Sequence, residues 1–444
     1  SFNSAILSID NIEMRYFGQN GQKYGIEIHD VGRNVNVSNI AMNRGYYGAI
    51  DVQSNGVNLQ GNVIYRAHLP VIRIFSGKRN VVADNLAVVG IWWYTHRDAF
   101  QGDEIFEVKL TPMMGMYHNQ ADNTQMRNNI ACGSERAGFT GPGSLCGDMT
   151  SFVGNIAHSS LSGFWWDFYS FGERAGSVMA PCKMLNDFTA WKIWEYGIYG
   201  ETTSQAQLHI VRVKVADCRV GILTVSGGHS SIDHVIKPKE VLIKQSLVVG
   251  HSANGHCLMT KPSLYTCKHY MAWCFHLPKF HSGILFGSFP QVQNDGPKIH
   301  PWWETAPEPS LYGVTKIEDT TLANFGSPCI EGPRANTRDV ALACMPSGAN
   351  PADGMGPLMA KDIEKVAVDL DSLLLFHATD ASWINGADCV DMDCDGMKHA
   401  IIHDLDGTLM GGSGGTIFPR AERFSRGSFF GLPFKDPVNH HQMR

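Results

Sequence analysis

Apolar and polar positions alternate in short runs along most of the chain, and this period of two predicts β-strands rather than helices. Similar runs recur at residues 34–44, 56–66, 80–90, 124–134 and 150–160. Each run contains an asparagine that precedes an aliphatic residue; these are Asn39, Asn62, Asn85, Asn129 and Asn155. The spacing of about 22 to 26 residues, with one interval that we interpret as two units, is typical of a solenoid whose coils each contribute short strands.

A single coil of this size cannot bury its own apolar face, but stacked coils form parallel sheets around a continuous core. The expected fold is therefore all-β: a right-handed parallel β-helix (solenoid) with long loop insertions. An ordinary sandwich or barrel is the alternative, although its strands usually recur every ~8 to 12 residues. We expect Asn62, Asn85 and Asn129 to stack on one edge as an amide ladder, at the ~4.8 Å spacing of neighbouring strands.

The expected β-helix covers residues 1–420, and residues 421–444 form a C-terminal tail. Longer segments between the coils are expected to be insertions, at about 91–122, 161–181, 254–312 and 327–362. Loops of this length on a rigid scaffold usually contribute binding residues or cover a flank. Adjacent tryptophans such as Trp165 and Trp166 suit stacking on a sugar, but packing of the loops on the solenoid is the simpler interpretation.

The balance of 36 Lys and Arg against 42 Asp and Glu gives a net charge of −6 without a block of like charge. This balance argues against a nucleic-acid or anionic-membrane partner. No apolar run approaches the ~18 to 20 residues of a transmembrane helix, so we expect no membrane insertion by this segment. The chain begins with neither an initiator methionine nor a signal peptide, which suggests a processed chain or a piece of something larger.

The eleven cysteines include no C-x-x-C pair, the spacing of many zinc and redox sites. Dispersed cysteines in a glycine-rich β chain favour disulfides and an oxidising, extracellular compartment. The alternative is a set of buried reduced thiols.

One motif suggests chemistry, because residues 401–412 are IIHDLDGTLMGG. A strand that ends in Asp-x-Asp-Gly-Thr opens phosphatases of the haloacid-dehalogenase type, in which the first aspartate, here Asp404, is the nucleophile. Only 38 residues follow Asp406, too few for the rest of that doubly wound fold. We therefore expect the turn of a terminal coil, in which the carboxylates accept backbone N–H hydrogen bonds and Gly407 supplies an unusual φ.

Three alternate aspartates, Asp391, Asp393 and Asp395, precede a glycine in the sequence DMDCDG. They resemble the start of an EF-hand loop, but the twelfth position is Ile402 where that loop needs a bidentate glutamate. Alternate side chains of a strand face the same way and repel, which favours either solvent exposure or a bound cation. The sequence therefore suggests these three residues as ligands for Ca²⁺, and it identifies no catalytic residue and no other cofactor.

Several segments resemble the C-terminal part of the parallel β-helix region of fibrocystin and fibrocystin-like proteins. They are NIAHSSLSGFWW, GILFGSFPQ, KIEDTTLANFG, DCVDMDCDGMKHAIIHDLDGTLMGG and GTIFPRAE, spread from about residue 120 to 422. In that family Asp-Leu-Asp-Gly closes a β-helix. The resemblance implies a piece of a very large secreted or membrane-tethered ectodomain at the cell or ciliary surface, where such proteins act as coat, adhesion or receptor molecules.

The resemblance favours a non-catalytic extracellular module that binds protein or glycan, with other domains of the same ectodomain as further partners. The alternative is a glycan-cleaving enzyme on a β-helix scaffold, either a polysaccharide lyase or a hyaluronidase-like hydrolase. Such an enzyme would need paired carboxylates, or a base beside acid-bound Ca²⁺. Its candidate acids are Asp98, Asp103 and Glu104, which lie close together in the first insertion.

Overall fold

The computed structural model describes the chain in segments, and all regular elements in them are β-strands. These segments are residues 7–19, 23–31, 34–92, 115–121, 123–166, 182–201, 207–225, 239–252, 281–287, 313–326, 339–344, 358–369, 372–375, 400–411 and 414–417. Contacts divide the chain into two compact units, the first formed by residues 1–177 and 183–199 and the second by residues 178–182 and 200–444.

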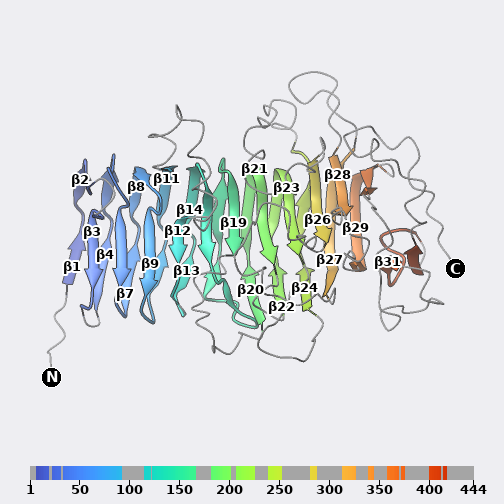
Figure 1. Cartoon of the computed structure of the whole chain (residues 1–444), viewed down its shortest axis with the longest axis horizontal. Coiled ribbons are helices and arrows are strands. Elements are labelled where there is room, and N and C mark those ends of the chain that lie inside the picture. Colours follow the sequence, from blue (N-terminus) through green and yellow to red (C-terminus); the bar gives the residue numbers. More distant parts are fainter. Residues whose placement is uncertain are drawn as a thin grey trace, which may run out of the picture. The chain divides into compact units, whose positions relative to one another are not determined.

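Most of the described strands of the first unit form three stacks of parallel strands, coloured blue to green in Figure 1, and β16 (Ser144–Leu145) and β20 (Cys182–Asn186) form an antiparallel pair. The first stack contains β1 (Leu7–Asp10), β4 (Val35–Ser38), β7 (Val57–Gln60), β10 (Val81–Ala83), β13 (Gln125–Arg127) and β17 (Phe152–Val153). The second contains β2 (Glu13–Arg15), β5 (Ala41–Asn43), β8 (Val63–His68), β11 (Leu86–Ile91), β14 (Ile130–Ser134), β18 (Asn155–His158) and the start of β21 (Phe188–Glu201). The third contains β3 (Ile26–His29), β6 (Ile50–Gln53), β9 (Ile72–Ser76), β12 (Gly115–Asn119), β15 (Ala137–Gly141) and β19 (Ser162–Trp166), which pairs with a later part of β21. Each coil crosses the three stacks in turn, and this all-β, stacked parallel architecture agrees with the expected class of fold.

The register of the first stack corrects one part of the sequence interpretation. Val37 pairs with Leu59, Leu59 with Val82, and Val82 directly with Met126. The interval of 44 residues is therefore a single coil with extra residues, not two coils. The strands β12 and β19 also lie within segments expected to be insertions, and both pair with strands of neighbouring coils.

The core of the first unit is built from side chains that repeat in register. In the third stack Tyr117 pairs with Phe139 and Phe139 with Phe164, and all three are buried. The rings of Tyr117 and Phe139 are stacked with centroids 4.7 Å apart and planes 8° apart. Burying a large apolar side chain of this kind stabilises the fold by about 1.5 to 3 kcal/mol. Tyr117 keeps its hydroxyl satisfied by donating to the carbonyl oxygen of Asn85 at 2.9 Å.

A buried amide ladder runs along the turn between the first and second stacks. The Nδ2 of Asn62 donates to Oδ1 of Asn85 at 2.8 Å, Asn85 donates likewise to Asn129 at 2.9 Å, and Asn129 to Asn155 at 3.0 Å. The Oδ1 atoms of Asn85, Asn129 and Asn155 each accept a second bond, from the backbone N–H of the asparagine in the preceding coil. Each Nδ2 also donates to a carbonyl of the preceding coil. The expected stacking of Asn62, Asn85 and Asn129 is thus confirmed.

Asn39, by contrast, is not part of this ladder. The register aligns Asn39 with Gly61, and Ile40 takes the ladder position and donates its N–H to Oδ1 of Asn62 at 3.2 Å. Asn39 belongs instead to a column of residues with positive φ, one position before the ladder. That column is Asn11, Asn39, Gly61, Asp84, Asn128, Gly154 and Asp187. Its members are all Asn, Asp or Gly, the residue types that enter the left-handed region at least cost.

The second unit also consists of stacked, mostly parallel strands (Figure 1). Its stacks contain β22 (Gln207–Val211), β23 (Lys214–Val225), β24 (Lys239–Lys244), β25 (Leu247–Val249), β26 (His281–Gly287), β27 (Gly313–Phe325), β28 (Asp339–Cys344), β29 (Leu358–Val368), β30 (Leu374–Leu375) and β31 (Ala400–Asp404). A final strand, β32 (Gly414–Ile417), pairs antiparallel with β31. The strands β26 and β28 again lie within segments expected to be insertions.

Hydroxyl side chains occupy the turn position in two coils of the second unit, at Ser246 and Thr320, and apolar side chains occupy it at Val213 and Ile363. Arg212, Gln245 and Asp319 have positive φ, and each precedes a residue that occupies the turn position. The turn position holds Ser246 in one coil, and its Oγ accepts the N–H of Val213 at 3.3 Å and donates to the carbonyl of Lys244 at 2.8 Å. The turn geometry is therefore retained while the side-chain chemistry changes.

We expect Asn85→Ala to destabilise the protein strongly, because it removes the Oδ1 acceptor that both the backbone N–H and Nδ2 of Asn62 use, and it leaves Oδ1 of Asn129 without its side-chain donor. The free energy of unfolding should fall by about 3 kcal/mol or more in urea denaturation, since each buried polar group left unpaired costs about 1 to 3 kcal/mol. Asn58→Ala is the matched control, because Asn58 lies on a partly exposed face and donates to Asn36. Equal losses for the two variants would contradict a structural role of the ladder.

Candidate functional site

The outer face of the third stack of the first unit carries a row of polar side chains, one from each coil. The register aligns Glu27 with Asp51, Asp51 with Arg73, Arg73 with His118, and His118 with Thr140. Successive coils bring these residues together although they lie about 22 or more positions apart in the sequence, which no local motif reveals.

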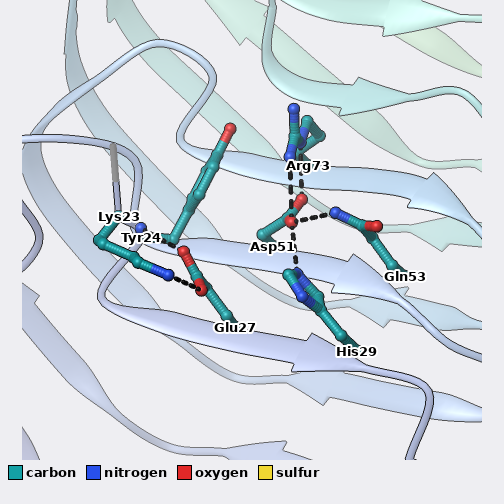
Figure 2. Close-up of polar contacts among 7 residues, drawn as sticks. All are labelled: Lys23, Tyr24, Glu27, His29, Asp51, Gln53 and Arg73. Atoms are coloured by element: carbon teal, nitrogen blue, oxygen red, sulfur yellow. Dashed lines mark hydrogen bonds and ion pairs between the residues drawn. The ribbon is translucent and has the colours of Figure 1, made fainter. Parts of the chain in front are cut away.

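Asp51 is the centre of this row, and Figure 2 shows three side chains directed at its carboxylate. Arg73 donates from Nε to Oδ1 at 2.6 Å and from Nη2 to Oδ2 at 3.0 Å. Gln53 Nε2 donates to Oδ2 at 2.9 Å, and His29 Nε2 lies 2.9 Å from the same oxygen. The Asp51 side chain is only 1% exposed, whereas His29 is 42% exposed. The carboxylate is thus buried and fully occupied, and its partners face outward.

The charges of Asp51 and Arg73 stabilise each other. Burial raises the pKa of Asp51, but the hydrogen bonds from Arg73, Gln53 and His29 outweigh burial and lower it below its ordinary value. Burial lowers the pKa of Arg73, and the hydrogen bond to Asp51 outweighs this effect and raises it. Asp51 is therefore held as an anion, which suits an ion pair and not a general acid.

Aromatic rings flank the ion pair. The guanidinium of Arg73 lies 5.1 Å from the ring centroids of both Tyr24 and Phe75, within the range of a cation–π contact. Tyr24 is buried and packs edge to face on Tyr47 at 5.0 Å, and burial raises its pKa well above the ordinary value. Beside it, Lys23 pairs with Glu27 at 3.5 Å (Figure 2). Phe75 is 48% exposed and extends this surface toward solvent.

His118 continues the row as a buried, neutral imidazole. Its Nδ1 lies 2.6 Å from Oγ1 of Thr140, which also accepts the backbone N–H of Gly115 at 3.2 Å. Burial, together with the positive charge of Arg73, lowers the pKa of His118 to about 4. At neutral pH this residue therefore contributes hydrogen bonds and no charge.

Beyond Thr140 the row becomes aromatic. Trp165 aligns with Thr140 and stacks on Tyr199, with ring centroids 3.8 Å apart and planes 6° apart. The adjacent Trp166 points the other way, is completely buried, and donates its indole N–H to the carbonyl of Pro142 at 3.2 Å. Both Trp165 and Trp166 therefore have packing partners within the protein, in agreement with the simpler of the two interpretations of this pair.

The Asp-Leu-Asp-Gly-Thr motif lies in the second unit and forms a turn, as expected. Asp404 accepts backbone N–H bonds from Gly407 at 3.1 Å, Leu409 at 3.4 Å and Met410 at 2.6 Å, and Gly407 has a φ of 82°. These contacts confirm the prediction that a carboxylate of the motif accepts hydrogen bonds from the backbone N–H groups of the turn. They also account for Asp404 without a nucleophilic role.

The same motif closes the exposed edge of β29. Asp406 Oδ2 accepts the N–H of Asp362 at 2.7 Å, and Thr408 Oγ1 accepts the N–H of Ile363 at 2.8 Å. Burial raises the pKa of Asp406, but the hydrogen bonds from Thr408 and Asp362 together outweigh burial and lower it to about 2. These side-chain oxygens replace acceptors that the next coil would supply, so the motif protects a sheet edge.

Several residues singled out in the sequence lie outside the described segments. They are the suggested Ca²⁺ ligands Asp391, Asp393 and Asp395, and the candidate acids Asp98, Asp103 and Glu104. Among the cysteines, Cys146 and Cys182 are disulfide-bonded, while Cys132 and Cys218 are in the thiol form, and the Cys218 thiol donates to the carbonyl of Ala216 at 3.3 Å. The chain thus contains at least one disulfide, and the side chains of the other seven cysteines are outside the described part.

The fold and its polar faces define a solenoid-like, all-β protein with repeated parallel coils. No protein-family model matches the chain. The chain is 27% identical to mouse fibrocystin-L and 26% to human fibrocystin-L, in each case over 93% of its own length. It is 22% identical to dog fibrocystin over 96% of its length. These similarities confirm that the chain is fibrocystin-like, and it spans about a tenth of the length of each of these relatives.

Asp404→Ala should lower the free energy of unfolding by about 1 to 3 kcal/mol, because three turn N–H groups lose their acceptor. Leu405→Ala is the matched control, since Leu405 is 47% exposed in the same turn and should change stability by no more than about 0.5 kcal/mol. Mg²⁺-dependent hydrolysis of p-nitrophenyl phosphate that disappears in Asp404→Asn would instead restore the phosphatase hypothesis.

His118 should make stability fall as the pH is lowered from about 6.5 to 4. Its pKa is about 4 in the folded protein, below the ordinary histidine value of 6.5, so the unfolded chain binds a proton first in this window. The contribution is fully present above pH 6.5 and amounts to at most about 3 kcal/mol. Urea denaturation at several pH values should show that the free energy of unfolding falls less steeply with decreasing pH for His118→Gln than for the wild type. Parallel pH dependences for the two proteins would refute the role assigned to His118.

Proposed function

We propose that this chain is a non-catalytic extracellular β-helix module of a large fibrocystin-like coat, adhesion or receptor protein. Similarity over nearly the whole chain to fibrocystin-L and fibrocystin supports this proposal. The disulfide-bonded Cys146 and Cys182 suit an oxidising compartment such as the cell or ciliary surface. Among the described residues no helix is long and apolar enough to cross a membrane.

The scaffold in this proposal is a right-handed parallel β-helix over residues 1–420, followed by a tail at 421–444. Parallel strands joined by crossover connections are right-handed in about 98% of cases, which supports the hand. Asp391, Asp393 and Asp395 remain the proposed Ca²⁺ ligands of this scaffold. Other domains of the same ectodomain are its proposed intramolecular partners.

The proposal of a non-catalytic function rests on one observation: both carboxylate oxygens of Asp51 are already occupied by hydrogen-bond partners within the protein. A glycosidase needs one carboxylic acid with a raised pKa and a second carboxylate placed across the substrate bond. Asp51 has a lowered pKa, and its oxygens are occupied by Arg73, Gln53 and His29. The outward parts of His29, Arg73 and Phe75 are instead suited to contacting a protein or a glycan without breaking a bond.

We expect the purified chain to release neither reducing ends nor unsaturated uronates from hyaluronan, pectin or alginate. A glycan array and a screen of extracellular proteins should then identify a ligand that binds without being changed. Phe75→Ala should weaken that binding about fivefold or more, as expected for the loss of an aromatic contact. Leu145→Ala, a similarly exposed residue (51%) outside the cluster, is the control and should leave binding unchanged.

The alternative function, a glycan-cleaving enzyme, predicts the opposite result. Product release by the wild-type chain that is abolished by Asp98→Asn, Asp103→Asn or Glu104→Gln would overturn the non-catalytic proposal. Binding that is unaffected by Phe75→Ala would exclude the Asp51 face as the ligand-contacting surface.

A further inference from the structure

The outer face of the second stack in the first unit is apolar, unlike those of its neighbours. Its strands each present two outward residues, which form two parallel rows across the coils. The first row is Glu13, Ala41, Val63, Leu86, Ile130, Ile156 and Thr189, and the second is Arg15, Asn43, Tyr65, Val88, Cys132, His158 and Trp191. Between the terminal strands, neither row contains Asp, Glu, Lys or Arg. We call this surface the apolar face.

The other two faces of the same unit show what an exposed face of this fold usually looks like. The first stack displays amides such as Asn36 and Asn58, which are hydrogen-bonded to each other at 2.8 Å. The third stack displays the Asp51 and Arg73 ion pair. On the apolar face, Val63 and Tyr65 are each 45% exposed. A contiguous apolar surface on one of three faces marks an interaction site.

Charged residues border the apolar face, and the two borders have opposite signs. Along the edge where the strands begin lie the acidic residues Glu13, Asp84 and Asp187. Along the opposite edge, where the chain bends out of the face, lie the basic residues Arg15, Arg44, Arg66 and Lys192. Asp84 and Asp187 belong to the positive-φ column before the ladder, so their positions are fixed by the turn. We call these edges the acidic border and the basic border.

These borders discriminate between the two ways in which a second copy can pack face to face. A two-fold axis parallel to the coil stack brings each acidic border onto the basic border of the other copy. Asp187 then faces the partner's Lys192, while Glu13 and Arg15, which form an ion pair within each copy, can also pair with their counterparts in the other copy. An axis perpendicular to the stack places acid against acid and base against base, which costs free energy because like charges repel.

We propose that the apolar face is a homodimer interface, in which a second copy of this chain packs with its two-fold axis parallel to the coil stack. The seven strands of the face span about 29 Å at the usual strand spacing. With a width of about 17 Å, the face can bury on the order of 1,000 Å² in total, the lower limit for a specific interface. The dimer is therefore a weak one, and it requires neither of the functions discussed above.

Sedimentation velocity on the purified chain, from about 1 to 100 µM, should show a reversible monomer–dimer equilibrium. Val63→Glu should raise the dissociation constant at least tenfold, because it buries a charge in the apolar face. Val366→Glu is the matched control, since Val366 is 46% exposed but lies in the second unit, and it should leave the equilibrium unchanged. Circular dichroism should show that both variants are folded.

Charge variants test the orientation of the two copies. Lys192→Glu and Asp187→Lys should each weaken self-association, and a one-to-one mixture of the two variants should form a heterodimer. Added salt should weaken the wild-type dimer, because opposite charges attract across both borders.

Three results would overturn the proposal. A chain that is monomeric throughout the concentration range, even one that binds a different protein through Val63, has no such homodimer. A dimer that Val63→Glu leaves intact uses another surface. A dimer that salt strengthens has the opposite orientation.

Discussion

The amide ladder is the constraint on which the first unit depends. Each coil must leave the first stack at the same place, and a left-handed residue followed by a buried asparagine makes that turn. The asparagine side chain can be buried because the neighbouring coils supply its donors and acceptors. A single coil would leave these groups unpaired, at a cost of about 1 to 3 kcal/mol each. The turn is therefore stable only as part of a stack.

Once the turns are fixed, the three outer faces can differ freely. One face displays amides, one an ion-paired row around Asp51, and one aliphatic and aromatic side chains. The second unit keeps the positive-φ turn but has Ser246 and Thr320 in two of its coils, and Val213 and Ile363 in two others, in place of asparagine. Its Asp-Leu-Asp-Gly-Thr turn then substitutes side-chain oxygens for the acceptors of a further coil. Turn geometry is thus the constant element of the architecture, and side-chain chemistry is the variable one.

The sequence predicted the ladder from Asn62, Asn85 and Asn129, because an amide that recurs at the coil period finds its hydrogen-bond partners in the amides of the neighbouring coils. It misplaced Asn39, because the coil from Val35 to Val57 is one residue shorter than the next, and a one-residue shift exchanges the ladder for the positive-φ column. The sequence interpretation also counted the 44-residue interval from Asn85 to Asn129 as two coils. An alignment of repeats alone does not distinguish one coil with an inserted segment from two coils, one of which has diverged.

The Asp51 cluster could not be predicted from a motif. His29, Asp51 and Arg73 come from three different coils, and each looks like an isolated polar residue in its own strand. A search at the coil period would have aligned Glu27, Asp51 and Arg73 in one row. It would not have shown that Asp51 is buried, because that depends on how the side chains around its carboxylate, those of Arg73, Gln53 and His29, are placed.

The ladder also has two defined ends, since Ile40 precedes Asn62 and Phe188 follows Asn155 at the same position. A chain that stacked its coils out of step by one would place Ile40 or Phe188 between two amides, or would break the row of amides with a residue from another position. Both errors interrupt a row of hydrogen bonds that all point the same way, because every side-chain oxygen accepts from the asparagine of the previous coil. Because the four asparagines are alike, only the residues at the two ends, Ile40 and Phe188, define which coils belong to the ladder.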